Sequence, residues 1–211
     1  EIVSLSNHIV FNSIAQLKRF ENKAIGKTSI GLRVNPEFSS VEVDLYNPCG
    51  VFSRLGTTRK NFDKDAIANI DGLHFHALCE QNVDALEGAL NNFEEKFGEF
   101  LPQMKWVNFG GGHHITRADY DVNGLIYLLK EFKLRYPHLE VYLEPGEAVG
   151  WKTGYLVATV LDIVNNGMDI AILDTSAEAH MPDTLAMPYR ADIRDSADIN
   201  VKKYSYRFGG N

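Results

Sequence analysis

Four polar segments of this chain each follow directly after a short apolar run. They are residues 32–35 (LRVN), 74–76 (HFH), 108–114 (NFGGGHH) and 143–147 (LEPGE). A run of glycines allows backbone N–H groups to approach an anion such as a phosphate. Histidine and glutamate can contact an aromatic cofactor or hold a proton on it. These residue types together suggest a site for a phosphate-bearing organic cofactor.

Each of these signals also has a plainer interpretation. His74 and His76 are two residues apart on a predicted strand and therefore point to the same face. We expect His76, nearer the strand end, to lie flat on an aromatic cofactor and the deeper His74 to be structural. Glu144 is either a solvated loop charge or the partner of a buried pyridine nitrogen. The glycines at 110–112 are either a phosphate loop or only a tight turn.

The elements that must position these residues alternate along the chain. Short β-branched runs are separated by stretches of helical period, a pattern typical of βαβ units around a parallel sheet. In a parallel barrel the active site lies at the C-terminal ends of the strands, where the polar segments occur. The predicted strands are residues 8–12, 29–35, 72–77, 106–109 and 140–144.

Amphipathic helices are predicted between these strands, one of them starting at an N-cap, Ser13, and running to about residue 20. Two others carry apolar stripes with a spacing of three and four residues, and we expect both stripes to be core. The first stripe is Val83, Leu86, Leu90, Phe93 and Phe97, and the second is Val122, Leu125, Ile126, Leu129 and Phe132.

The rhythm changes after residue 154. Two strand-like runs, 155–165 and 168–174, are joined by Asn165-Asn166-Gly167, which predicts a hairpin. The predicted fold class is therefore α/β, with a partial (β/α)8 barrel in residues 1–151 and the start of an antiparallel β domain in residues 152–211. Five strands are too few to close such a barrel, so we expect both termini to be truncated and about three βα units to precede residue 1.

Composition narrows the class of protein further. The 211 residues are 45% apolar with a formal net charge of −7, which argues against nucleic acid as a partner. No apolar run approaches the ~20 residues that span a bilayer, so no membrane association is expected. Only Cys49 and Cys79 occur, which favours a reducing, cytoplasmic location. The acidic balance permits a cationic substrate without requiring one.

The order of the motifs Phe75-His76, Gly110-Gly111-Gly112 and Glu144-Pro145-Gly146 resembles the fold type III enzymes that use pyridoxal 5′-phosphate (PLP). These include ornithine, diaminopimelate and arginine decarboxylases and, more distantly, alanine racemase. Three segments, 52–56 (FSRLG), 144–148 (EPGEA) and 172–180 (ILDTSAEAH), are similar to carboxynorspermidine decarboxylases in particular. The resemblance covers essentially the whole chain. It implies PLP-dependent decarboxylation of carboxynorspermidine or carboxyspermidine to norspermidine or spermidine by a homodimer.

The resemblance also implies roles for individual residues. His76 matches the histidine stacked on the PLP ring, and Glu144 matches the carboxylate paired with the pyridine nitrogen, which makes these two the catalytic candidates. The other matching positions imply contacts to the cofactor: the strand-end Arg33, Cys79 in place of a serine near the phosphate, Gly110, Gly111 and Gly112 of the phosphate loop, and Gly146 beside Glu144.

Two departures from the family stand out. Glu147 replaces an arginine that contacts phosphate, and with His180 and Asp183 it is a candidate for binding the ammonium groups of a polyamine-like amino acid. The second departure is the lysine that forms the Schiff base with PLP, which no lysine of this chain matches. Lys105 starts a strand, and the others considered lie on predicted helices: Lys18, Lys23, Lys96, Lys130 and Lys133.

Two alternatives remain open from the sequence. A zinc-dependent barrel hydrolase would use histidines and an aspartate as ligands, but it leaves the glycine loop and Glu144-Pro145-Gly146 unexplained. The second alternative is a non-catalytic PLP-barrel fragment. The candidate zinc ligands are His74, His76, His113, His114 and Asp174.

Overall fold

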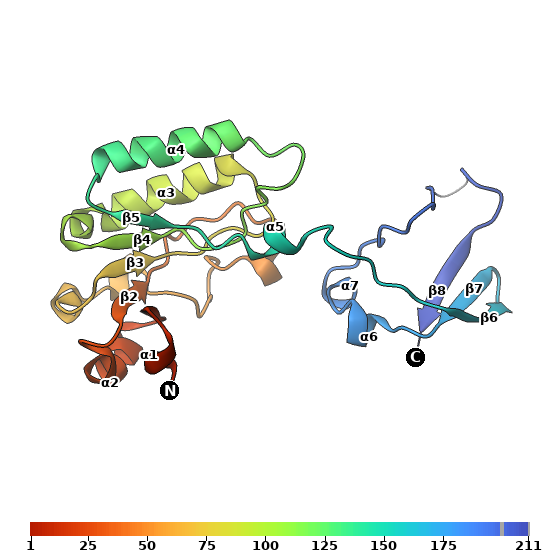
Figure 1. Ribbon diagram of the computed structural model, residues 1–211, viewed down its shortest axis with the longest axis horizontal. Coiled ribbons are helices and arrows are strands. Elements are labelled where there is room, and N and C mark those ends of the chain that lie inside the picture. The colour runs from red at the N-terminus through yellow and green to blue at the C-terminus, as the bar shows by residue number, and fades with distance from the viewer. Residues whose placement is uncertain (199–200, 211) are drawn as a thin grey trace. The chain divides into compact units, whose positions relative to one another are not determined.

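The computed structural model describes residues 1–198 and 201–210. The chain divides into two compact units, Glu1–Trp151 and Lys152–Asn211, drawn in Figure 1. Each unit has its own sheet, with no strand shared between them in the described part of the chain.

The first unit is built on a parallel sheet of five strands that follow one another in chain order. This arrangement confirms the predicted α/β class, because consecutive βα units place successive parallel strands side by side. Each strand ends one to three residues before its predicted end, and those last residues belong to the following loop. The strands are β1 (His8–Phe11), β2 (Ser29–Arg33), β3 (Gly72–His74), β4 (Trp106–Asn108) and β5 (Glu140–Tyr142).

Helices connect most of these strands. A short α1 (Ile2–Leu5) precedes β1, and the Ser13 hydroxyl accepts the Gln16 N–H at 3.2 Å to start α2 (Ile14–Ala24). Figure 1 shows α3 (Val83–Phe97) and α4 (Val122–Arg135) side by side over one face of the sheet. Helix α5 (Gly146–Gly150) follows β5. None of the helices in the described residues is both long and apolar enough to cross a membrane.

The connection from β2 to β3 differs from the prediction of a helix between each pair of strands. It holds three short 3-10 turns, η1 (Asp44–Tyr46), η2 (Arg59–Asn61) and η3 (Lys64–Ile67), and no α-helix. A further turn, η4 (Gly98–Gln103), continues α3. The long irregular segment between β2 and β3 stays at the C-terminal ends of the strands for part of its course, and there it contributes to a cavity described below.

The core lies between the sheet and its helices. Strand residues Leu32, Leu73 and Val107 are fully buried, and each contributes about 1.5–3 kcal/mol by leaving water. The stripe of α3 is buried as predicted, with Val83 only partly so. The stripe of α4 was predicted too broadly. Val122 and Ile126 are 47% and 44% exposed, because α4 buries a narrower face than its apolar residues cover.

The opposite face of the sheet carries the polar residues. Arg33, His74, Asn108 and Tyr142 are register partners across β2 to β5, so they form one row. Since side chains alternate along a strand, this row points away from the buried leucines. One layer below it, the indole N–H of Trp106 donates to the Ser29 hydroxyl at 2.8 Å.

Trp106 depends on two strand glycines. A Cβ atom on Gly72 would lie 2.1 Å from the indole ring, and one on Gly31 would lie 2.3 Å from it. Both distances are far below any tolerated contact between carbon atoms. The indole therefore occupies the space that two side chains would otherwise fill, and it is only 3% exposed.

The second unit is a small mixed sheet. Strands β6 (Val160–Asn165) and β7 (Asp169–Leu173) form the predicted antiparallel hairpin. Strand β8 (Tyr206–Gly210) then pairs with β7 in parallel, so the sheet that begins with this hairpin is mixed. A parallel partner requires a long crossover and leaves no local turn signal in the sequence. Two one-turn helices, α6 (Ala177–His180) and α7 (Asp183–Ala186), occur in that crossover.

Candidate active site

Glu144 is held at the C-terminal edge of the sheet by the polar row. The Asn108 side-chain amide donates to its Oε1 at 2.7 Å, and the His74 Nε2 lies 3.7 Å from its Oε2. The contact with His74 and then that with Asn108 lower the pKa of Glu144 to about 2, although partial burial opposes them. The carboxylate is therefore ionised at neutral pH, and because its side chain is about half exposed it can also pair with a cationic ligand.

His76 lies beside Glu144 with a fixed ring orientation. Its Nδ1 accepts the Gly111 N–H at 3.1 Å, which leaves the proton of the neutral ring on Nε2. Burial and then the nearby charge of Arg33 lower the pKa of His76. His76 is thus a neutral, partly buried ring that a neighbouring backbone holds in place.

The glycine loop that follows β4 is compact. Gly110 and Gly112 have φ angles of +72° and +82°, and a Cβ atom on Gly112 would lie 2.2 Å from the Leu78 carbonyl oxygen. Glycine is required at such positions because an L side chain would meet the backbone. The buried His113 supports the loop from within, since its Nε2–H donates to the Gly110 carbonyl at 2.9 Å.

The donors of this loop are not all available to a ligand. The Gly110 N–H donates to the Asn108 side-chain oxygen at 2.8 Å, and the Gly111 N–H donates to His76. Within the described residues, the Gly112 N–H has no acceptor. Of the three predicted phosphate donors, Gly112 is therefore the one that can receive an anion without a change in these contacts.

A cavity of about 1380 Å³ opens beside the loop. Arg33, His76, Cys79, Gly112 and Glu147 all line it, so five of the predicted site residues meet around one space. Burial lowers the pKa of the Arg33 guanidinium, which is close enough to feel the charge of Glu144.

The remaining predicted residues are placed differently. Gly146 begins α5 and donates its N–H to the Glu144 carbonyl at 2.8 Å. A Cβ atom there would meet no neighbour, so a tight approach does not explain this glycine. His180 and Asp183 are exposed residues of α6 and α7 in the second unit, whereas Glu147 belongs to the first. The three predicted substrate-binding residues therefore belong to two separate units, and their shared role stays a prediction.

The zinc hypothesis finds no matching ligand set. Among the described residues, the group of His, Cys, Asp and Glu side chains close enough to share an ion is Glu80, His114 and Glu147. Of these, only His114 was among the zinc candidates. Sequence reasoning missed Glu80. It also assigned no role to Asn108, although this residue begins the polar segment 108–114 near the end of a predicted strand.

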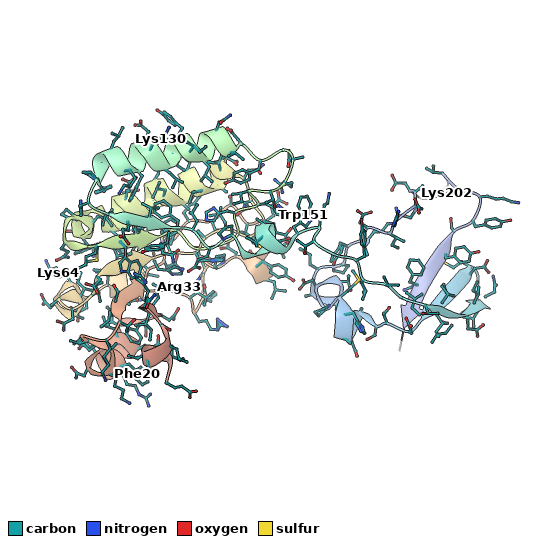
Figure 2. All side chains as sticks on the ribbon, viewed as in Figure 1. Phe20, Arg33, Lys64, Lys130, Trp151 and Lys202 are labelled. Carbon is teal, nitrogen blue, oxygen red and sulfur yellow. The ribbon has the colours of Figure 1, made fainter. Side chains whose placement is uncertain are left out.

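The lysines of the first unit are not part of the cavity wall. Its lining contains no lysine among the described residues. Lys105 precedes β4 and pairs with Asp71 at 2.7 Å, at the opposite end of the strands. The others considered lie on helices, as Lys130 does on α4 in Figure 2.

Comparisons with known proteins identify the relatives of this chain. No protein-family model matches it. Over its whole length, however, it is 54% identical to the carboxynorspermidine/carboxyspermidine decarboxylase of Campylobacter jejuni. The chain is similar to this decarboxylase from end to end. It spans 58% of the length of that relative, and it is 43% identical to 55% of the carboxyaminopropylagmatine decarboxylase of Synechocystis.

Solved structures show the same likeness. The C. jejuni carboxynorspermidine decarboxylase, solved in complex with norspermidine, matches the entire chain with a TM-score of 0.88 and 52% identity, over 57% of its own length. The arginine decarboxylase of Paramecium bursaria Chlorella virus matches 97% of this chain and 58% of its own, with a TM-score of 0.70. At 16% identity, the second likeness supports the fold alone.

Proposed function

We propose that the full-length protein containing this chain catalyses the PLP-dependent decarboxylation of carboxynorspermidine or carboxyspermidine in polyamine biosynthesis. The observation that carries the proposal is the ionised Glu144, which faces the same sheet edge as the neutral His76 and the glycine loop. The relative named for this reaction is 54% identical over all 211 residues and supports the same assignment. No feature of the described residues favours a hydrolase or a non-catalytic role.

The residues at the sheet edge fit PLP as the cofactor. When bound, PLP supplies an electron sink for loss of the carboxylate as CO₂. Glu144 would hold the proton on the ring nitrogen, because a carboxylate with so low a pKa accepts a hydrogen bond without becoming protonated itself. His76 would lie against the ring as a neutral, orientated partner. The Gly112 N–H and Arg33, both on the cavity, would contact the phosphate.

The substrate side of the proposal concerns Glu147, His180 and Asp183. A polyamine-like amino acid carries ammonium groups far from its reacting carbon, and carboxylates bind such groups by charge-assisted hydrogen bonds. Glu147 lines the cavity and Asp183 is exposed on the second unit. We further propose a cytoplasmic homodimer, in keeping with the resemblance set out above.

The test is an activity assay on the full-length protein with PLP. Carboxynorspermidine, carboxyspermidine and carboxyaminopropylagmatine are compared, and CO₂ release is measured for each. We expect turnover of the first two to exceed that of the third, in line with the higher identity to the C. jejuni relative. Glu144→Gln should lower kcat at least tenfold while PLP retention changes little. Absence of turnover on all three substrates would overturn the proposal.

A further inference from the structure

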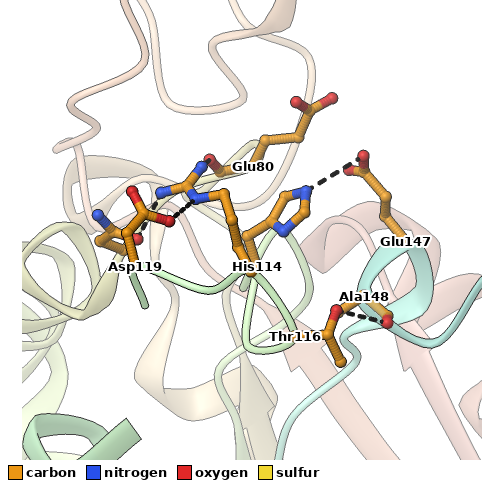
Figure 3. Close-up of polar contacts among 8 residues, drawn as sticks. Glu80, His114, Thr116, Asp119, Glu147 and Ala148 are labelled. Carbon is orange, nitrogen blue, oxygen red and sulfur yellow. Dashed lines mark hydrogen bonds and ion pairs between the residues drawn. The ribbon is translucent and has the colours of Figure 1, made fainter. Parts of the chain in front are cut away.

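Three side chains outside the Glu144 site converge on one point at the cavity wall. Glu80 lies in the loop after β3, His114 in the loop after β4, and Glu147 on α5. One ligand atom from each lies within 4.8 Å of the other two. Figure 3 shows the His114 ring directed at the Glu147 carboxylate, with Glu80 nearby. Glu80 and Glu147 also line the cavity that His76 shares.

The cluster carries negative charge that the protein does not neutralise. Partial burial and then the charge of Glu80 raise the pKa of Glu147, while His114 opposes the rise. Within residues 1–198 and 201–210, neither carboxylate forms an ion pair with Lys or Arg. The closest partner is the His114 Nε2, 3.5 Å from Glu147 Oε1. Two carboxylates placed this close lack a cation.

His114 provides an independent sign of a ligand. It is only 4% exposed, yet its Nδ1 has no hydrogen-bond partner among the described residues, and its Nε2 is directed into the cluster at a distance too long for a strong hydrogen bond. Buried polar groups are normally paired, since leaving one unpaired costs free energy. The nitrogen without a partner is Nδ1, whereas Nε2 lies against Glu147. With the proton of the neutral ring on Nδ1, Nε2 can accept from a donor placed between the imidazole and the carboxylates.

The surrounding backbone holds the carboxylates together against their repulsion. Glu80 has a φ angle of +53°, which is uncommon for a residue with a side chain. Arg117 fixes it, donating to the Glu80 carbonyl at 3.3 Å and to the Asn82 side chain at 2.6 Å. On the other side, the Thr116 hydroxyl donates to the Ala148 carbonyl at 2.7 Å and ties down α5 (Figure 3). Glu147 is carried by that helix.

We propose that Glu80, His114 and Glu147 bind a distal ammonium group of the substrate, with Glu80 as the second carboxylate of that site. The inference rests on the proposed function, since it requires a polyamine-like substrate. An ammonium nitrogen with hydrogen bonds of about 2.8 Å holds its acceptors up to about 4.6 Å apart. This spacing fits the observed spread of the three ligand atoms. A zinc ion, with bonds near 2.0–2.2 Å, draws its ligands closer together.

The test measures norspermidine binding to the full-length, PLP-loaded protein by titration calorimetry. Glu80→Gln and Glu147→Gln each remove one charge while keeping the size of the side chain. We expect each to weaken norspermidine binding about tenfold to a hundredfold, because a hydrogen bond to a charged group is lost. Glu95→Gln, on the exposed face of α3, removes the same charge elsewhere and should leave the affinity unchanged. The dissociation constant of PLP should be the same in all variants.

A second variant covers the possibility that Glu80→Gln fails to fold. Glu80→Asn also removes the charge, and asparagine tolerates a positive φ better than most residues. Unchanged norspermidine affinity in a folded Glu80 variant, with wild-type turnover of carboxynorspermidine, overturns this inference alone. Loss of PLP affinity in the variants would assign the cluster to the cofactor and overturn the inference. Loss of norspermidine binding by the wild-type protein on treatment with EDTA would assign the cluster to a metal ion and also overturn it. Norspermidine binding that depends on Glu80 in a protein without decarboxylase activity supports the ammonium site and overturns only the proposed reaction.

Discussion

Replacement of Glu144 by glutamine should make stability depend less on pH. In the folded chain His74 and Asn108 stabilise the Glu144 anion and lower its pKa from 4.5 to about 2. Such a difference is worth at most about 3.4 kcal/mol in favour of the folded state at neutral pH. About half of the side chain is exposed, however, so solvent screening reduces this figure, and we expect Glu144→Gln to cost about 1–2 kcal/mol at pH 7.

The sign of the pH dependence follows from a pKa that is lower in the folded state. The stabilisation is complete above the unfolded pKa of 4.5 and is lost as pH falls through about 2. Urea unfolding of wild type and Glu144→Gln is compared at pH 7 and pH 3, with Glu95→Gln as the charge control. The cost of Glu144→Gln at pH 3 should be about two fifths of its value at pH 7. An equal cost at both pH values would refute the electrostatic account and leave only packing.

Three further predictions concern the lysine, the glycine loop and substrate selectivity. Borohydride treatment of the 211-residue chain with PLP should leave no phosphopyridoxyl-lysine by mass spectrometry; a stoichiometric label on one lysine would contradict the absence of a cofactor lysine here. Gly112→Ala should lower the free energy of unfolding by about 2–4 kcal/mol, because residue 112 has a positive φ and a Cβ atom there would meet a carbonyl oxygen. In the control Gly154→Ala the new Cβ atom meets no neighbour, so the melting temperature should change little. In the full-length enzyme, Asp183→Asn should reduce kcat/KM for carboxynorspermidine roughly tenfold to a hundredfold and leave kcat/KM for a short amino acid without distal amines unchanged. Equal losses of kcat/KM on both substrates would indicate a cofactor or folding role.

The sequence predicted the features that depend on local patterns. The alternation of short apolar runs with helical stretches, and the polar residues where those runs end, were enough to place His76 and Glu144 at one edge of a parallel sheet. The hairpin at residues 165–167 carried a turn signal of its own. The glycine loop was located correctly, but its internal contacts to Asn108 and His76 leave fewer donors for an anion than the glycines alone indicate.

The features that were missed depend on contacts between distant residues. Glu80 lies close to His114 and Glu147 with its backbone in a left-handed conformation, for which a glutamate gives no sequence signal. The parallel pairing of β8 with β7 joins segments more than 30 residues apart. The exposure of Ile126 depends on how much of α4 its neighbours cover, which periodicity alone does not determine.

The indole of Trp106 beneath the polar row has a consequence for how such a sheet can change over evolution. Residues 31, 72 and 106 share one fixed volume, divided here as two hydrogen atoms and an indole. A larger residue at position 31 or 72 is compatible with the sheet only if position 106 shrinks by a similar volume. In related proteins, the side chain at position 106 should therefore be smaller wherever those at positions 31 and 72 are larger. The height at which Asn108 and His74 meet a ligand is preserved only while the total side-chain volume at positions 31, 72 and 106 stays constant.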